Sequence, residues 1–154
     1  MKPIVIVLSL LALFGECKAA LSHYLNPGIK IGYQFGNNNG FVIGPEISFT
    51  AIDDKSLVYF GPVFGISLFP KNFHIISYAE AEFGWKALGI SLGSQWDKGL
   101  QSRLRIFAGA IGFASFMVNL SDFSRECAGV VKVPLLKDGK DIQVLHYDIG
   151  LHMM

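Results

Sequence analysis

Residues 28–35 read Gly-Ile-Lys-Ile-Gly-Tyr-Gln-Phe, and this stretch decides the fold class that we predict. Its apolar residues occupy every second position from Ile29 to Phe35, whereas Lys30, Gly32 and Gln34 occupy the positions between them. Successive side chains of a β-strand point to opposite faces of the sheet. The period of two therefore predicts a strand with one apolar face and one face of polar or small residues.

The same alternation recurs along the rest of the chain. Further runs are found at residues 41–51, 57–69, 75–83, 88–95, 102–113, 130–134 and 145–153. Most segments between them are short, and those at 36–40, 53–56 and 137–140 are rich in turn-forming residues. About eight strands joined by turns predict an all-β chain, folded as a closed antiparallel up-and-down barrel.

Three stretches depart from this simple pattern. Pro45 lies inside the second run and cannot donate a hydrogen bond, so we expect a bulge or a missing ladder bond there. Residues 106–118 carry no charge and allow an alternative interpretation as a short membrane helix. That run is shorter than the ~20 residues that a membrane-spanning helix needs, so the strand interpretation is favoured. Residues 119–127 form the longest polar connection that we predict.

The N-terminal residues have the layout of a secretion signal. Lys2 supplies a positive start, residues 4–14 form an apolar run, and Cys17-Lys18-Ala19 places small residues before a cleavage site. The apolar run is too short to span a bilayer as a helix. We therefore predict an exported protein, with a cleaved signal peptide at residues 1–19 and one barrel domain at residues 20–154.

The composition narrows the range of functions. Charged residues make up 16% of the chain and hydrophobic residues 51%, which argues against disorder and against nucleic-acid binding. Cleavage after Ala19 would leave eleven basic and eleven acidic residues, with Cys127 as the remaining cysteine. An internal disulfide is then impossible, so stability must come from the barrel itself. Lipid modification of Cys17 is an alternative, although Glu16 precedes it where such sites usually have a small neutral residue.

The charged residues of the predicted strands all fall on the face opposite the apolar one. That face is otherwise mostly Gly, Ser and Gln, unlike the charge-rich surface of a soluble barrel. An unpaired buried charge is very costly, so charges inside a barrel must be paired. We therefore predict a structural ion-pair network in the lumen, with four basic and four acidic members: Lys30, Glu46, Glu80, Glu82, Arg103, Arg105, Lys132 and Asp148.

The pattern from residue 28 to residue 153 resembles the small eight-stranded outer-membrane barrels of Gram-negative bacteria. The resemblance implies a place in the bacterial outer membrane, contact with membrane lipid, a monomeric state and a structural, adhesion or small-molecule contact role. A barrel of this size is normally filled by side chains, so no open pore is expected. Trp85 and Trp96 would lie at the two membrane interfaces. The chain departs from the family at its end, because Met153-Met154 stands where such barrels usually have an aromatic residue.

His146, Asp148 and His152 are the residues that most suggest a chemical site. They would share one face of the last strand, but a metal site needs at least three correctly directed ligands and no second cluster is found. Residues 89–93 have the spacing of a nucleophile motif around Ser91, yet they lie inside a strand pattern and not at a turn. We therefore predict no enzyme activity, no metal and no cofactor, with the polar cluster filling the lumen.

Two alternatives for the function stay open. One is a soluble lipocalin-like barrel, secreted or periplasmic, whose apolar faces line a pocket for a lipophilic ligand. The other is a membrane-embedded enzyme that modifies lipid, which would need Ser, His and a carboxylate within hydrogen-bond reach.

Overall fold

The computed structural model describes residues 21–36, 38–53, 55–97, 99–109, 112–137 and 140–141. Within these ranges the chain consists of β-strands joined by turns and contains no helix. Eight long strands follow one another: β1 (Leu21–Phe35), β2 (Gly40–Asp53), β3 (Val58–Phe69), β4 (His74–Trp85), β5 (Leu88–Trp96), β6 (Leu100–Gly109), β7 (Gly112–Asn119) and β8 (Arg125–Lys132). Two short strands, β9 (Leu136–Lys137) and β10 (Lys140–Asp141), come after them.

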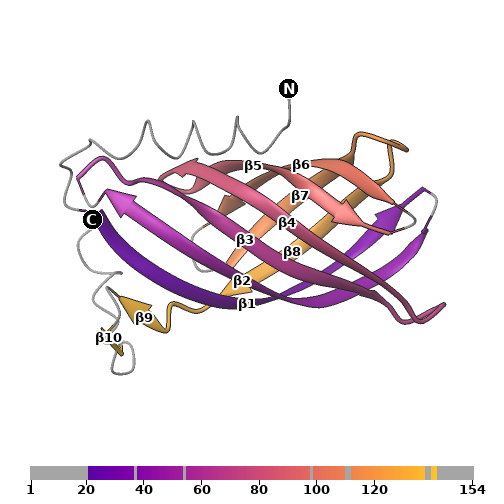
Figure 1. Ribbon diagram of the computed structural model, residues 1–154, viewed down its shortest axis with the longest axis horizontal. Coiled ribbons are helices and arrows are strands. Elements are labelled where there is room, and N and C mark those ends of the chain that lie inside the picture. Colours follow the sequence, from indigo (N-terminus) through magenta and orange to yellow (C-terminus); the bar gives the residue numbers. More distant parts are fainter. Residues whose placement is uncertain are drawn as a thin grey trace.

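The eight long strands form a closed ring. Each strand pairs in antiparallel fashion with the next one, and β1 pairs with both β2 and β8 (Figure 1). The predicted all-β, closed antiparallel barrel of eight strands is thereby confirmed. The connections after β1, β3, β5 and β7 lie at one end, here called the β1–β2 end. Those after β2, β4 and β6 lie at the other end, called the β2–β3 end.

The structure corrects the strand boundaries in the second half of the chain. The predicted strand at residues 102–113 is two strands, because β6 ends at Gly109 and β7 begins at Gly112. β8 begins at Arg125, inside the stretch that we predicted to be a polar connection. The alternative of a helix at residues 106–118 is wrong, since the described residues there pair with one another in the β6–β7 ladder.

The ring closes through β8, and β9 continues the line of β8 beside the first half of β1 (Figure 1). The backbone amides of Val133 and Leu135 donate hydrogen bonds to the carbonyls of Pro27 and Leu25, each at 2.9 Å. The run at residues 145–153, which we predicted as the last strand, lies outside the described residues. The predicted signal peptide at residues 1–19 also lies outside them.

The apolar faces of the strands point outward. Every strand from β1 to β8 contributes at least one exposed large apolar side chain: Ile29, Ile31, Tyr33, Phe35, Phe41, Phe49, Phe64, Ile66, Ile75, Phe83, Trp85, Leu88, Ile90, Leu92, Trp96, Leu100, Ile106, Phe116 and Val131. Charge is nearly absent from this outer wall. Among the Lys, Arg, Asp and Glu residues of β1 to β8, those that are not buried are Asp53 and Arg125, each at the end of its strand.

The interior holds two small apolar clusters and a layer of charged side chains. Val42, Phe69 and Ile76 form a buried apolar cluster near the β1–β2 end. Phe107, Phe113 and Val130 form a second one near the β2–β3 end, with Tyr59 packed against it. The charged groups of the buried ionic side chains meet between these clusters and form the charged layer. Buried polar side chains lie beside the clusters, so each cluster covers one side of the interior at its end of the barrel.

Two Gly-Pro pairs bring β2 and β3 unusually close. The β2–β3 ladder passes from the Ile43–Leu68 pair to the Glu46–Gly65 pair without pairing the two residues between them, so the interruption that we expected at Pro45 is present. A Cβ atom on Gly44 would clash with the carbonyl oxygen of Ile66. A Cβ atom on Gly61, which precedes Pro62, would likewise clash with the carbonyl oxygen of Phe49.

We expect Gly44→Ala to lower the free energy of unfolding by about 2 kcal/mol, because the added methyl group must push two backbones apart. Gly129→Ala is the matched control, since its Cβ would lie 3.9 Å from the nearest atom, which is ordinary contact. The control should change stability by less than about 0.5 kcal/mol. Urea unfolding in detergent, followed by tryptophan fluorescence, measures both. Equal losses would contradict this account of the β2–β3 contact.

Candidate functional site

The charged layer of the interior is the candidate site. The structure brings together seven of the eight residues that we predicted for the lumen network; the eighth, Asp148, lies outside the described residues. The seven lie on the inner faces of five strands: Lys30 on β1, Glu46 on β2, Glu80 and Glu82 on β4, Arg103 and Arg105 on β6, and Lys132 on β8. Each is 8% exposed or less, so the period of two has turned every one of them inward.

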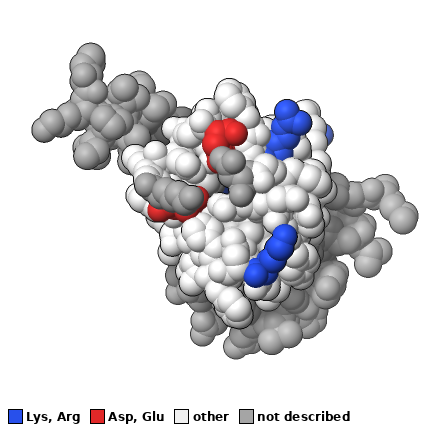
Figure 2. Space-filling model, turned by 90° about the vertical axis from the view of Figure 1, so that its right-hand side faces the viewer, with Lys and Arg blue, Asp and Glu red and all other residues white. Residues whose placement is uncertain are grey.

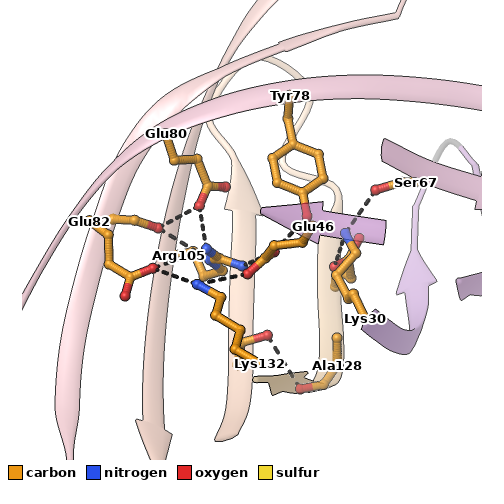
Figure 3. Close-up of polar contacts among 12 residues, drawn as sticks. Lys30, Glu46, Ser67, Tyr78, Glu80, Glu82, Arg105, Ala128 and Lys132 are labelled. Carbon is orange, nitrogen blue, oxygen red and sulfur yellow. Dashed lines mark hydrogen bonds and ion pairs between the residues drawn. The ribbon is translucent and has the colours of Figure 1, made fainter. Parts of the chain in front are cut away.

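Arg105 lies at the centre of this layer and contacts three carboxylates (Figure 3). Its Nη1 atom is 2.9 Å from Glu46 Oε2, and its Nη2 atom is 2.8 Å from Glu80 Oε2. The third contact, from Nη2 to Glu82 Oε2, is longer at 3.7 Å. Ser91 Oγ donates to Glu80 at 2.7 Å and accepts a hydrogen bond from Arg105 Nε at 3.2 Å.

Lys132, which comes from β8, contacts two of the same carboxylates. Its Nζ atom is 2.9 Å from Glu46 Oε1 and 3.0 Å from Glu82 Oε2 (Figure 3). The hydroxyl of Tyr78 donates to Glu46 Oε2 at 2.7 Å. Glu46 and Glu82 are thus each held between two cations that come from different strands.

A second group of contacts surrounds the ring of Tyr78. The Arg103 guanidinium lies 4.0 Å from the ring centroid and Lys30 Nζ lies 4.7 Å from it, which is the geometry of cation–π contacts. Arg103 Nε pairs with Glu80 Oε1. Lys30 Nζ donates to Ser67 Oγ at 2.8 Å and pairs with Glu126 Oε1, also at 2.8 Å.

Glu126 is the member of the layer that the sequence interpretation missed. We had placed it in a polar connection, whereas it lies on β8 and is 1% exposed. Counting back from Lys132 in steps of two through Val130 and Ala128 reaches Glu126, so the alternation itself carried the signal. Glu126 was overlooked because we began the predicted strand at Val130, four residues after it.

The described interior is balanced in charge. We use the name inner charge network for its eight buried Lys, Arg and Glu side chains: Lys30, Arg103, Arg105 and Lys132, with Glu46, Glu80, Glu82 and Glu126. Each of the eight takes part in at least one ion pair. Side chains held by opposite charges in this way are fixed in position, which suits a structural role better than proton transfer.

The described residues contain no catalytic or metal-binding site built from the other candidate residues. Ser91 lies in the middle of β5 and belongs to the inner charge network's hydrogen bonds, not to a nucleophile turn. His146 and His152, like Asp148, lie outside the described residues. Within the part of the chain that the structure describes, no group of three or more His, Cys, Asp and Glu side chains could hold a metal ion. The same part of the chain has no helix that is long and apolar enough to cross a membrane.

One further polar contact joins three connections at the β1–β2 end. His74 Nε2 lies 2.8 Å from Asp97 Oδ1, and the amide of Asn38 donates to Asp97 Oδ2 at 3.3 Å. These residues are far apart in sequence, so no local motif could have predicted the contact. It ties the connections after β1, β3 and β5 to one another.

Comparison with known proteins adds no relative: no family model matches the chain, and no match was found among curated proteins or among solved structures.

The pair of Lys30 and Glu126 gives a clean test of interior pairing, because Lys30 is the one described cation within ion-pair distance of Glu126. We expect Lys30→Met alone to lower the free energy of unfolding by about 3–5 kcal/mol, since Glu126 is left buried without a counter-charge. Adding Glu126→Gln should recover about 1–3 kcal/mol. A double-mutant cycle from urea unfolding measures the coupling. Strictly additive losses would show that the two side chains do not meet.

Arg105→Met removes one buried cation, and either Glu82→Gln or Glu80→Gln would restore the charge balance. The ion pairs in the structure nevertheless predict different stabilities for the two double variants. Adding Glu82→Gln leaves three complete pairs, because Glu80 keeps Arg103, Glu46 keeps Lys132 and the Lys30 pair is untouched. Adding Glu80→Gln deprives Arg103 of its carboxylate.

We therefore expect Glu82→Gln to restore more stability to Arg105→Met than Glu80→Gln, by about 1 kcal/mol or more. The unfolding midpoints of the two double variants, compared at equal protein and detergent concentration, give the answer. The reverse order would mean that Glu80 is not the carboxylate on which Arg103 depends.

Proposed function

We propose that this chain is a membrane-spanning β-barrel of a bacterial outer membrane, without enzymatic activity and without an open pore. The observation that carries the proposal is the inverted distribution of side chains: large apolar residues cover the outside, and the charges are inside. A soluble barrel has the opposite arrangement, because its core must exclude water. Lipid favours an apolar outer wall and allows polar residues only in the lumen.

The extent of the apolar wall supports this proposal. Soluble monomers rarely expose continuous apolar patches larger than a few hundred Å². Here the exposed apolar side chains run around all eight strands, and charge enters the wall only at Asp53 and Arg125. The face in Figure 2, which looks at the β1–β2 end, also shows only a few separate charged groups.

The height of the wall is suitable for a membrane. Trp85 pairs with Leu88 at the start of β5, and Trp96 ends that strand, so eight residues separate the two levels. Eight residues of strand span about 27 Å, which a tilt of about 40° reduces to roughly 20 Å along the barrel axis. The apolar band of an outer-membrane barrel is about 25 Å tall with aromatic residues at both borders. Both indoles are half exposed and would lie at those borders.

The filled interior supports a role other than conduction. The inner charge network occupies the middle of the barrel, and an apolar cluster lies on either side of it. Water or ions would have to displace these side chains to pass. The connections at the β1–β2 end are three to five residues long, which leaves little surface for a large partner. Among the structural, adhesion and small-molecule contact roles, the structural role is therefore favoured.

The two alternative functions fit the described residues less well. A lipocalin-like barrel needs an apolar pocket inside, whereas the described interior is polar and charged between its two small apolar clusters. A lipid-modifying enzyme needs a nucleophile beside a base, and Ser91 is engaged by Glu80 and Arg105 instead.

The first test of the proposal is gel mobility of the mature protein in detergent, with and without boiling. A closed membrane barrel resists dodecyl sulfate until it is heated, so the unboiled band should migrate differently from the boiled one. Far-UV circular dichroism of the unboiled sample should be β-rich. A protein that is monodisperse in buffer without detergent would contradict the proposal.

A charge on the outer wall gives a second test. Leu92 is 58% exposed near the middle of β5, and we expect Leu92→Arg to destabilise the lipid-inserted barrel by about 2–4 kcal/mol. Leu92→Phe, an apolar change at the same position, should have little effect. Folding into vesicles, measured by the boiling-dependent band shift across a urea series, reports both. If Leu92→Arg folds as well as the unmodified protein, the wall does not face lipid.

A further inference from the structure

The outer wall has an open hollow on the face formed by β6, β7 and β8. It has a volume of about 1000 Å³ and an almost entirely apolar lining. Five of the nine exposed residues that line it are small, namely Ala108, Gly112, Ala114, Cys127 and Gly129, and the larger Leu88, Ile106, Phe116 and Val131 complete the lining. On the other strands the corresponding outward positions carry many large apolar side chains, so the hollow is a local thinning of the wall.

The fold does not require two of the glycines that open this hollow. A Cβ atom on Gly129 would have its nearest neighbour at 3.9 Å, and one on Gly112 would have it at 4.0 Å. Neither residue has the positive φ angle that favours glycine. Gly44 and Gly61, in contrast, are needed because β2 and β3 approach closely. Space on the outer wall is thus left open where larger side chains would fit.

An exposed cation lies one outward position beyond the β8 residues that line the hollow. Arg125 is the next outward residue of β8 beyond Cys127, and it is exposed. It is the one Lys or Arg of β1 to β8 that is not buried, and the structure shows no ion pair between it and a described carboxylate. It lies at the β1–β2 end, where Trp96 also ends its strand, which is the level of a membrane border in the proposed function.

We propose that this hollow binds one phospholipid of the surrounding bilayer, with an acyl chain lying along β6–β8 and the headgroup phosphate on Arg125. The inference rests on the proposed function, since a lipid can enter only from a membrane. A guanidinium suits the phosphate because it donates two parallel hydrogen bonds to an anion of this shape. The distance along β8 from Arg125 to Val131, about 20 Å at the usual strand rise, provides a long apolar track beneath the phosphate.

A second copy of the chain is a poorer occupant. Two barrels inserted in the same orientation and related by a twofold axis would present the same patch to each other. Two hollows would then face each other and leave a void. The two Arg125 side chains would also lie at the same level without a counter-charge. A lipid supplies both the apolar filling and the anion.

Native mass spectrometry of the full chain, purified in detergent and titrated with palmitoyl-oleoyl phosphatidylglycerol, tests the proposal. We expect one lipid to be retained per barrel. Gly129→Leu, which fills the hollow, and Arg125→Gln, which removes the cation, should each weaken retention about five- to tenfold. Gly112→Leu fills the hollow at a second position in case Gly129→Leu does not fold. Diacylglycerol with the same chains, which has no phosphate, should bind about as weakly to the unmodified protein as phosphatidylglycerol binds to Arg125→Gln.

Two matched variants control for general effects. Ala81→Leu adds a similar bulk, one carbon less, to the exposed outer face of β4, and Lys71→Gln removes an exposed cation at the same end of the barrel as Arg125. Both should retain the lipid as the unmodified protein does. The boiling-dependent band shift checks that every variant is folded.

Four results would overturn the lipid site. Retention by Gly129→Leu, Gly112→Leu and Arg125→Gln equal to that of the unmodified protein would show that lipid binds elsewhere. A folded barrel that retains no lipid, or one that dimerises through a Cys127–Cys127 crosslink and so excludes lipid, would remove the site but leave the membrane barrel intact. A chain that is soluble without detergent would remove both proposals.

Discussion

The pairing of charges inside a closed ring is the constraint on which the rest of this structure depends. A buried ion without a partner costs several kcal/mol, so the four cations and four carboxylates of the inner charge network must meet one another. They come from five different strands, and a slip of one residue in any of these strands would turn its charge to the outside. Arg105 shows the coupling most clearly, because its three carboxylate partners lie on β2 and β4 while it lies on β6. The register of the barrel and the ion pairs therefore require each other.

The outer wall follows from the same alternation. Once the polar face of each strand points to the interior, its apolar face has to point outward, and in the proposed function this wall faces lipid, which favours apolar side chains. The two apolar clusters at the ends of the interior complete the arrangement. Together with the buried polar side chains beside them, they fill the interior around the charges, and ion pairs in such a low-dielectric interior are stronger than in water. The wall is thin at the hollow over β6–β8, which lies next to Arg125, the one Lys or Arg of β1 to β8 that is not buried.

Much of this arrangement was predictable from the sequence, for a physical reason. The period of two is a local property, so it revealed the all-β class, the approximate number of strands and the inward direction of seven of the charged residues. Boundaries were harder, because residues 106–118 carry no charge, and their glycines, Gly109 and Gly112, look like the glycines found inside the other strands. Glu126 was missed for the related reason that its strand is short and begins among polar residues. The closure of β8 on β1, the contact of His74 with Asp97 and the outer hollow depend on strands that are distant in sequence, which no local pattern reports.

The most direct test of the account is a nitroxide scan of β5 in lipid vesicles, on a Cys127→Ser background. Labels at Ile90 and Leu92, which point outward, should collide with oxygen dissolved in the bilayer. A label at the buried Gln95 should collide little with oxygen and little with a water-soluble nickel complex, because the interior is filled. The account predicts this alternation together with the exclusion of both probes from the inside. Free access of the nickel complex to the label at Gln95 would show a water-filled lumen. Free access of the nickel complex to the labels at Ile90 and Leu92 would show that the wall faces water. Either result would contradict the account.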